Sequence, residues 1–180
     1  MESIVYTHIF YAFKNIIYLN QHGFFRKRST ITNLLSFTDI VIKSFSESAE
    51  VHTVYTDLSK AFDKISHKIL INKLSAYGVS GHLLLWFTSY LDNRSQIVKF
   101  KNCFSSSQII TSGVPQGSIL GPLLFSIYIN DVSNILKCNF SLFADDLKIF
   151  KTIRDSNDMF LLQSDLDSLS LWCKDNLMKL

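Results

Sequence analysis

Apolar residues recur at the spacing of one helical face in six stretches of the chain. The expected apolar faces are Val5, Ile9, Phe13 and Ile16; Leu34, Phe37, Val41 and Phe45; Ile65, Ile69 and Leu74; Leu84, Phe87 and Leu91; Leu124, Ile127 and Tyr128, continued by Val132 and Ile135; and Leu162, Leu166, Leu169, Cys173 and Leu177. The expected helix starts and stops are Ser29–Thr30, Gly78, Ser80 and Ser156 or Asn157.

Short β-prone runs lie between these helical stretches. Residues 51–56 are rich in β-branched and aromatic side chains, and the run ends at Asp57. Residues 97–100 and 108–111 are expected to pair as a hairpin. Residues 112–122 contain three glycines and two prolines, which enforce an irregular backbone. The pattern favours one α+β domain with a small, largely antiparallel sheet backed by helices.

Two adjacent acids, Asp145 and Asp146, lie between two further β-prone runs, residues 140–143 and 147–150. Because Asp is disfavoured inside strands, the pair is expected at the tip of a hairpin. Adjacent carboxylates suit Mg²⁺, which takes carboxylate oxygens together with substrate phosphates. The alternative is an exposed turn, in which Asp is common for local hydrogen-bonding reasons.

A third acid favours the metal interpretation. Asp57 ends the strand expected at residues 51–56, 88 positions before Asp145. If the strands are neighbours in one sheet, three carboxylates converge at its edge. Two divalent ions roughly 3.5–4 Å apart could then bridge them, which is the arrangement used for in-line nucleotidyl transfer.

Composition narrows the class of protein further. A chain of 180 residues with 47% hydrophobic content can bury the core of one domain, and a net charge of +3 is too small to indicate a polyanion partner. Three widely spaced cysteines, Cys103, Cys138 and Cys173, argue against a disulfide framework. The apolar run near the N-terminus contains polar residues and no cleavage site, so neither a membrane span nor a signal peptide is expected. The expected location is intracellular, in the nucleus or cytoplasm.

Five segments together resemble the reverse transcriptases of non-LTR (LINE-type) retrotransposons. Residues 57–63 (DLSKAFD), 112–122 (SGVPQGSILGP) and 143–146 (FADD) are similar to motifs A, B and C, in that order. Residues 21–24 (QHGF) with Ser29-Thr30 resemble the segment ahead of motif A, and residues 162–167 with Trp172 and Asn176 resemble the start of motif D. The resemblance implies a polymerase palm-type sheet in residues 51–180 and a partial fingers subdomain in residues 1–50, without a thumb.

The resemblance also implies a metal site. Asp57, Asp145 and Asp146 match the catalytic acids that bind two Mg²⁺ ions, for which Mn²⁺ can substitute. The backbone of Leu58 would complete one coordination shell. The implied reaction is RNA-directed DNA synthesis, with an RNA template, a DNA primer and deoxynucleoside triphosphates as partners and no membrane.

Nucleotide-binding residues follow from the same motifs. Phe62 matches the aromatic gate that excludes a ribose 2′-hydroxyl, with a core aromatic as the alternative interpretation. The backbone N–H groups around Lys60 and Ala61 would lie near the triphosphate. Gln116 and Gly117 match residues that contact the incoming nucleotide and template, and for Gln116 the alternative is a plain loop amide.

A basic cluster, Arg26, Lys27 and Arg28, is the best candidate for contact with nucleic-acid phosphates, with a solvated loop as the alternative. Against the family pattern, most of the fingers, the end of motif D and the thumb are expected to be missing. A non-catalytic retrotransposon relic that binds nucleic acid weakly is therefore the alternative function, and a phosphohydrolase is a third. We expect no polymerisation by this chain alone, and we expect the last helix to leave Leu169, Trp172 and Leu177 uncovered.

Overall fold

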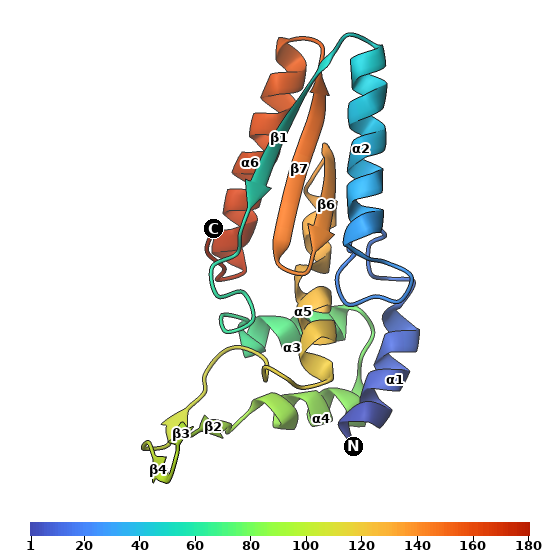
Figure 1. Cartoon of the computed structure of the whole chain (residues 1–180). Helices are drawn as coiled ribbons and strands as arrows, with labels where there is room; N and C mark the ends of the chain where they lie inside the picture. Colours follow the sequence, from blue (N-terminus) through green and yellow to red (C-terminus); the bar gives the residue numbers. More distant parts are fainter.

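A computed structural model describes all of residues 1–180 as an α+β fold (Figure 1). The helices are α1 (Glu2–Phe13), α2 (Thr30–Ser46), α3 (His67–Ala76), α4 (Gly81–Leu91), α5 (Leu120–Ile129), the 3₁₀ helix η1 (Asn130–Asn134) and α6 (Ser156–Asp175). The strands are β1 (Glu50–Thr56), β2 (Ser95–Gln96), β3 (Lys99–Phe100), β4 (Cys103–Phe104), β5 (Gln108–Ile109), β6 (Asn139–Phe143) and β7 (Asp146–Ile153). The fold class expected from the sequence is confirmed. None of the helices has the length and hydropathy needed to cross a membrane.

The central sheet has three antiparallel strands in the order β1-β7-β6. β6 and β7 form a hairpin whose last pair is Phe143 with Asp146, and β1 pairs with β7 along its whole length. Along β7, Leu147 and Ile149 belong to the main core, whereas Lys148 and Phe150, which are also buried, alternate with them on the face beside α2. The strand alternation therefore fixes which side chains remain on the other face.

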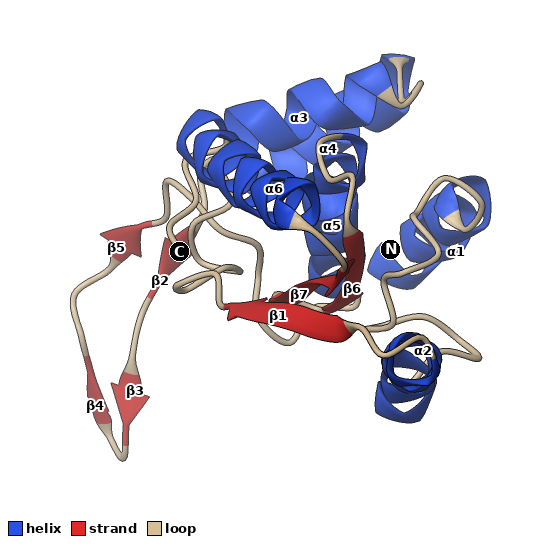
Figure 2. Cartoon of the chain, turned by 90° about the horizontal axis from the view of Figure 1, so that it is seen from above, coloured by secondary structure: helices blue, strands red, loops and turns tan.

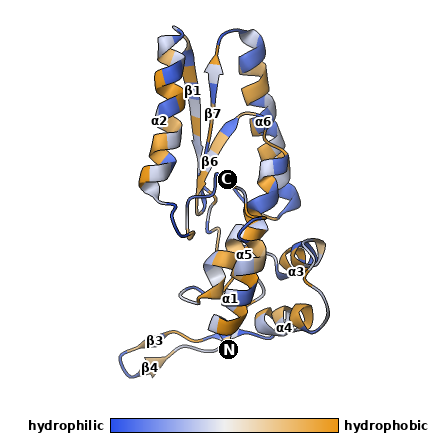
Figure 3. Cartoon of the chain, turned by 90° about the vertical axis from the view of Figure 1, so that its right-hand side faces the viewer, coloured by the Kyte–Doolittle hydropathy of each residue, from blue (hydrophilic) through white to orange (hydrophobic).

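The helices cover the two faces of the sheet unequally. Figure 2 shows α3, α4, α5 and α6 gathered on one side of β1 and β7, and α2 alone on the other. Every residue of α5 except Pro122 is buried, and Figure 3 shows this helix as mostly hydrophobic at the centre of the helical layer. The core is therefore built around α5 and one face of the sheet. The opposite face is left with a single helix beside it.

The last helix is better covered than expected. Leu169 is 1% exposed and Trp172 is 6% exposed, so the expectation that both lie uncovered is wrong. α6 packs along β7, and the indole Nε1 of Trp172 donates a hydrogen bond of 3.0 Å to Asp131 Oδ1. Leu177 is exposed, as expected.

Apolar spacing predicted the buried face of α2 only in part. Phe37 and Val41 are half-buried, and Phe37 meets Phe150 edge-on. Leu34 and Phe45 are exposed, however, whereas Asn33 and Ser44 are buried. The cause is polar contact with the sheet: Asn33 Nδ2 donates to the carbonyl of Leu142, and Ser44 Oγ lies 2.7 Å from Thr152 Oγ1. The helix therefore docks on the sheet through a mixed face, with hydrogen bonds on either side of Phe37.

Helix ends also differ in part from expectation. α1 ends at Phe13, so the helical face expected to continue to Ile16 stops there, and Ile17 is buried instead of Ile16. Ser29 caps α2 in a capping box with Thr32, as its position predicted. The last helix is capped by Asp155, whose carboxylate accepts from two backbone N–H groups, and not by Ser156 or Asn157.

The expected hairpin between residues 97–100 and 108–111 is wrong in its pairing. β2 pairs with β5 and β3 pairs with β4, so the segment forms two short ladders in one projecting arm (Figure 1). The chain reverses at Lys101, which has a φ of +53°, and the tighter turn brings Cys103 and Phe104 onto β3. The turn position, which periodicity does not reveal, sets the register.

Candidate active site at the end of the sheet

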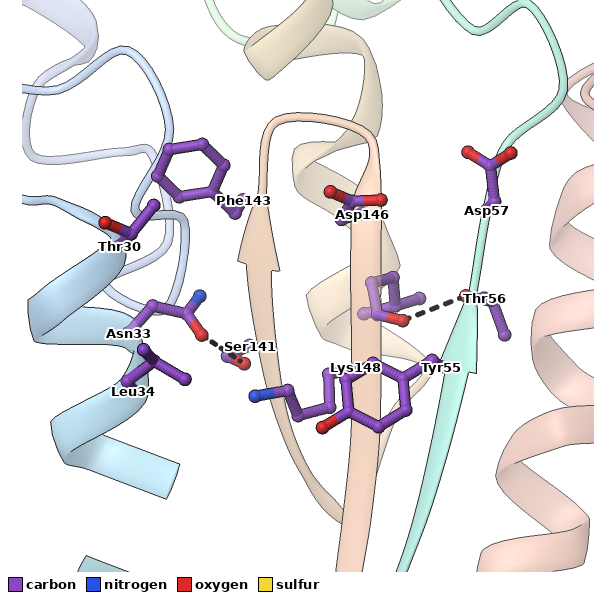
Figure 4. Close-up of a pocket in the computed structure, with 11 residues that line it drawn as sticks. Thr30, Asn33, Leu34, Tyr55, Thr56, Asp57, Ser141, Phe143, Asp146 and Lys148 are labelled. Atoms are coloured by element: carbon purple, nitrogen blue, oxygen red, sulfur yellow. Dashed lines mark hydrogen bonds between the residues drawn. The ribbon is translucent and has the colours of Figure 1, made fainter. Parts of the chain in front are cut away.

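The acids on β1 and β7 meet at one end of the sheet. Thr56 pairs with Leu147, and the same register continued by one residue brings Asp57 opposite Asp146. Thr56 Oγ1 donates a hydrogen bond of 3.1 Å to the carbonyl of Leu147, which ties the two strands just below the acids. Figure 4 shows the carboxylates of Asp57 and Asp146 pointing in the same direction from neighbouring strands. The convergence expected from the sequence is present for this pair.

The hairpin tip has an unusual backbone. A two-residue turn, Ala144 and Asp145, joins the strands, and Ala144 has a φ of +58°. A hairpin turn with a positive φ at its first central position normally carries glycine there, because a Cβ is strained in that conformation. The position of Asp145 therefore depends on a turn that its surroundings must stabilise.

Gln21 supplies that stabilisation from the N-terminal segment. Its side chain is 2% exposed and holds Ala144 from both sides: Oε1 accepts from the Ala144 N–H at 3.0 Å, and Nε2 donates to the Ala144 carbonyl at 3.2 Å. Oε1 also accepts from the Gly23 N–H at 2.9 Å. A Cβ on Gly23 would lie 2.4 Å from the nitrogen of Ala144, so only glycine permits this approach. The sequence resemblance included Gln21 without assigning it this contact.

The carboxylates affect one another electrostatically. Burial raises the pKa of Asp146, and the charges of Asp145 and Asp57 raise it further. No group of three His, Cys, Asp or Glu side chains lies close enough together to enclose a metal ion. The donor set is nevertheless composed only of carboxylates, and a cation would relieve their mutual repulsion. The chemistry of these donors fits a hard divalent cation such as Mg²⁺.

The turn after β1 and the glycine-rich loop before α5 lie against each other. Gly113 donates its N–H to the carbonyl of Ile65, and the Val114 N–H donates to the carbonyl of Phe62. Gly113 has a φ of +88°, and a Cβ there would lie 2.9 Å from the Phe62 carbonyl oxygen. Glycine is needed at this contact, which brings two motifs 50 residues apart in the sequence onto one surface.

The candidate nucleotide-binding residues lie partly together. Phe62 stacks on Phe125 with ring centroids 4.5 Å apart and meets Phe24 edge-on at 6.0 Å. It also lines a pocket of about 260 Å³ with Gln116 and Gly117. Phe62 thus packs on the core and faces a cavity, which combines the two interpretations that the sequence left open. Gln116 and Asp63 are joined by a hydrogen bond of 2.8 Å.

The other candidates in the turn after β1 have different surroundings. The side chains of Leu58 and Ala61 are buried, and the Ala61 N–H donates to the carbonyl of Leu58 at 3.1 Å. This N–H is therefore already paired within the turn. Lys60 is exposed and has a φ of +52°.

The basic cluster divides into two kinds of side chain. Arg26 and Lys27 are exposed. Arg28 is half-buried, lies over the ring of Phe25, and donates from Nη1 to the carbonyls of Tyr18 and Gln21. Arg28 therefore holds the loop that carries Gln21.

A second cavity begins at the acids and extends along the sheet towards α2. It has a volume of about 420 Å³, and Asp57, Asp146 and Lys148 line it together with the first turns of α2 (Figure 4). Sequence reasoning missed Lys148 and Asn33 here. Alternation along β7 could have indicated Lys148, which lies two residues after Asp146 on the same face.

The chain was compared with known proteins and structures. The family model described as reverse transcriptase (RNA-dependent DNA polymerase) matches residues 1–180. A probable RNA-directed DNA polymerase from transposon BS of Drosophila melanogaster is 30% identical over 175 residues, which is 89% of this chain and 18% of that protein. The RNA-directed DNA polymerase from mobile element jockey of Drosophila funebris is 31% identical over 114 residues, 63% of this chain and 12% of that protein.

A solved structure has the same fold. It is an apo telomerase from Candida tropicalis truncated from its C-terminal domain, with a TM-score of 0.66 and 12% identity over 98% of this chain and 39% of that one. The chain spans less than a fifth of the length of the two transposon polymerases. The match along all 180 residues and these relatives establish that the chain belongs to the reverse transcriptase family, in the LINE-type form found in non-LTR retrotransposons.

Proposed function

We propose that this chain carries the polymerising centre of an RNA-directed DNA polymerase, which adds deoxynucleotides to the 3′-hydroxyl of a DNA primer on an RNA template. The observation that supports this most directly is the position of Asp57 opposite Asp146, one residue beyond the last pair of β1 and β7 and next to the turn of Asp145. In this proposal residues 51–180 are the palm and residues 1–50 are part of the fingers.

The acids would hold the metal ions. Asp57, Asp145 and Asp146, with the carbonyl of Leu58, are the ligands we assign to two Mg²⁺ ions, since reverse transcriptases as a family use divalent metal ions. When bound, such ions lower the pKa of an attacking hydroxyl and neutralise charge on the leaving pyrophosphate. The contribution of the chain itself is to keep the carboxylates in place, which Gln21 and the strand register support.

Phe62, Gln116 and Gly117 would receive the incoming nucleotide. Their shared pocket of about 260 Å³ supports this assignment, and the stacking of Phe62 on Phe125 would keep its ring in one position. A fixed aromatic ring under the sugar would exclude a ribose 2′-hydroxyl by steric contact. The backbone N–H of Lys60 would lie towards the triphosphate, near the N–H of Ala61, which bonds to the carbonyl of Leu58.

Primer extension tests the proposal. Residues 1–180 would replace the corresponding segment of the jockey polymerase, with an RNA template, a DNA primer, deoxynucleotides and Mg²⁺ or Mn²⁺. We expect extension by this chimera and none by its Asp145→Asn, Asp146→Asn variant. A chimera that folds and binds the primer–template but never extends the primer contradicts the proposal.

The 180-residue chain alone is the second arm of the experiment. We expect no extension above the same double variant, because only Arg26 and Lys27 of the basic cluster are free to contact phosphates and positioning contributes roughly 7–11 kcal/mol in favourable reactions. Extension by the chain alone would show that its own contacts suffice. It would also exclude a non-catalytic relic.

A further inference from the structure

The ammonium of Lys148 has no ionic partner within the chain. Lys148 follows Asp146 by two residues on β7, and its side chain lies on the same face of the sheet. The residue is only 8% exposed, yet its ammonium forms none of the four ion pairs in the molecule and no hydrogen bond. The ammonium is not among the buried polar atoms, so it is the stem of the side chain that is buried while Nζ opens onto the adjoining cavity. The charge is therefore available to an anion that the chain itself does not supply.

Two aromatic rings hold the ammonium in place. Nζ of Lys148 lies 4.1 Å from the ring centroid of Phe37 on α2 and 5.3 Å from that of Tyr55 on β1. Figure 4 shows the nitrogen pointing away from the strand towards α2, within the cavity of about 420 Å³. Cation–π contacts fix the position of the charge but do not neutralise it. The ammonium is thus presented to whatever occupies the cavity.

The walls of the cavity suit a nucleic-acid strand. Thr30 provides a hydroxyl group, and the Tyr55 ring, which is 70% exposed, offers a stacking face. Asn33 is hydrogen-bonded to Ser141 and to the carbonyl of Leu142. The cavity reaches Asp57 and Asp146 at one end and shares no residue with the pocket of Phe62, Gln116 and Gly117. The cavity beside the acids is therefore distinct from the pocket assigned to the incoming nucleotide.

Spacing along the strand suggests which phosphate would reach Lys148. Two residues of an antiparallel strand advance about 7 Å, at about 3.4 Å per residue. Nucleotides of one strand advance by about 3.4 Å each along a duplex axis. With the 3′-hydroxyl at the acids and the duplex axis taken along β7, a group about 7 Å away along the sheet meets the backbone roughly two nucleotides upstream.

We propose that the cavity between α2 and the sheet is a primer-strand site, in which Lys148 binds a backbone phosphate about two nucleotides from the 3′ end. This rests on the proposed polymerase function, which leaves the strand that occupies the cavity unassigned. Lys148 is here a binding residue for the primer and has no part in the chemical step.

The test measures binding and needs no activity. Fluorescence anisotropy would give the Kd of the 180-residue chain for a recessed DNA primer on an RNA template and for a blunt duplex of the same length. A series of primers would each carry one neutral methylphosphonate, at successive linkages from the 3′ end. The proteins are the wild type, Lys148→Met, Lys148→Arg, and Lys137→Met as a control lysine that is exposed at the opposite end of β6.

We expect the neutral linkage about two nucleotides from the 3′ end to weaken binding by the wild type about tenfold, as loss of one charge-assisted hydrogen bond should. Lys148→Met should bind the unmodified primer about tenfold more weakly and be insensitive to that linkage. Its plot of log K against log salt should lose about one unit of slope. Lys148→Arg should largely restore the wild-type profile, and Lys137→Met should retain it.

Two results would overturn the inference in distinguishable ways. If the wild type prefers the recessed end but Lys148→Met shows the same linkage profile, the polymerase proposal stands and Lys148 serves only to pack against Phe37 and Tyr55. If the wild type does not distinguish the recessed end from the blunt duplex, the primer site and the proposed function fail together.

Discussion

Replacing Gln21 by Ala is the sharpest test of how the acid-bearing hairpin is held. The substitution removes the side-chain amide that bonds to the N–H and carbonyl of Ala144 and to the N–H of Gly23. These backbone groups lie in a buried part of the molecule, and Ala144 has a positive φ. The hairpin tip would lose the contacts that keep this conformation.

The size of the effect follows from these three hydrogen bonds. Each buried backbone group left without a partner costs about 1–3 kcal/mol. Water that enters the vacated space can satisfy part of this demand. We therefore expect the free energy of unfolding to fall by about 2–4 kcal/mol, a large fraction of the 5–15 kcal/mol typical of a domain.

Urea denaturation would measure the loss, and hydrogen exchange would locate it. Exchange should accelerate at the amides of Ala144 and Gly23. Gln21→Met keeps the length of the side chain and removes only its polar atoms, so it separates the lost hydrogen bonds from the cavity left by Ala. The matched control is Gln163→Ala, because Gln163 is exposed on α6 and bonds only to Asp167.

The control should lose no more than about 0.5 kcal/mol. If Gln21→Ala and Gln21→Met both match the control, and the amide of Ala144 exchanges as in the wild type, the turn does not depend on Gln21. The reasoning about a strained, externally held hairpin would then be refuted.

The remaining predictions concern the acids, the aromatic gate and a buried histidine. Calorimetric titration with Mg²⁺ or Mn²⁺ should show weak binding by the wild type and weaker binding by Asp57→Asn and by Asp145→Asn. If both variants bind the ion as the wild type does, these acids do not form the metal site. Phe62→Val in the jockey chimera should increase the ratio of ribonucleotide to deoxynucleotide incorporation, because the lost discrimination is worth about 1–3 kcal/mol. An unchanged ratio in a folded variant would mean that Phe62 is a core residue only. Burial and then the charge of Arg28 lower the pKa of His22 from 6.5, so the unfolded chain takes up the proton first and stability should fall as pH decreases through 6.5 towards the lower folded value. Thermal denaturation between pH 7.5 and 5.5 measures this, and a His22→Gln variant with the same pH dependence would refute it.

The position of the acids was predictable because it depends on local pattern. A β-prone run ending at Asp57 and two such runs around Asp145 and Asp146 are visible in the sequence, and antiparallel pairing then brings the strand ends together. The helix face with Phe87 and Leu91 was equally predictable, since both side chains are buried. A periodic pattern of apolar residues predicts which face of an element is buried, and the strands and the helix named here are buried through such apolar faces.

The supports of the site were not predictable, because they are polar and distant in sequence. Gln21 contacts Ala144 over 123 residues, and Asn33 contacts Leu142 over 109. An amide in a loop and an amide in a helix look like solvated groups in any local pattern. Lys148 has the same character, since a lysine in a strand resembles a residue facing water. The contacts that fix these side chains exist only after the elements have docked.

The topology of the sheet also implies an order in which the acids meet during folding. β6 and β7 are joined by two residues, and a hairpin of this kind closes in about 1–10 μs. Asp57 lies 88 residues from Asp145, so β1 reaches β7 only when the intervening helices have compacted. A nascent or partly folded chain can therefore present Asp145 and Asp146 as an isolated pair. The opposing carboxylate of Asp57 arrives with the long-range pairing of β1, which makes the complete set of acids a property of the assembled domain alone.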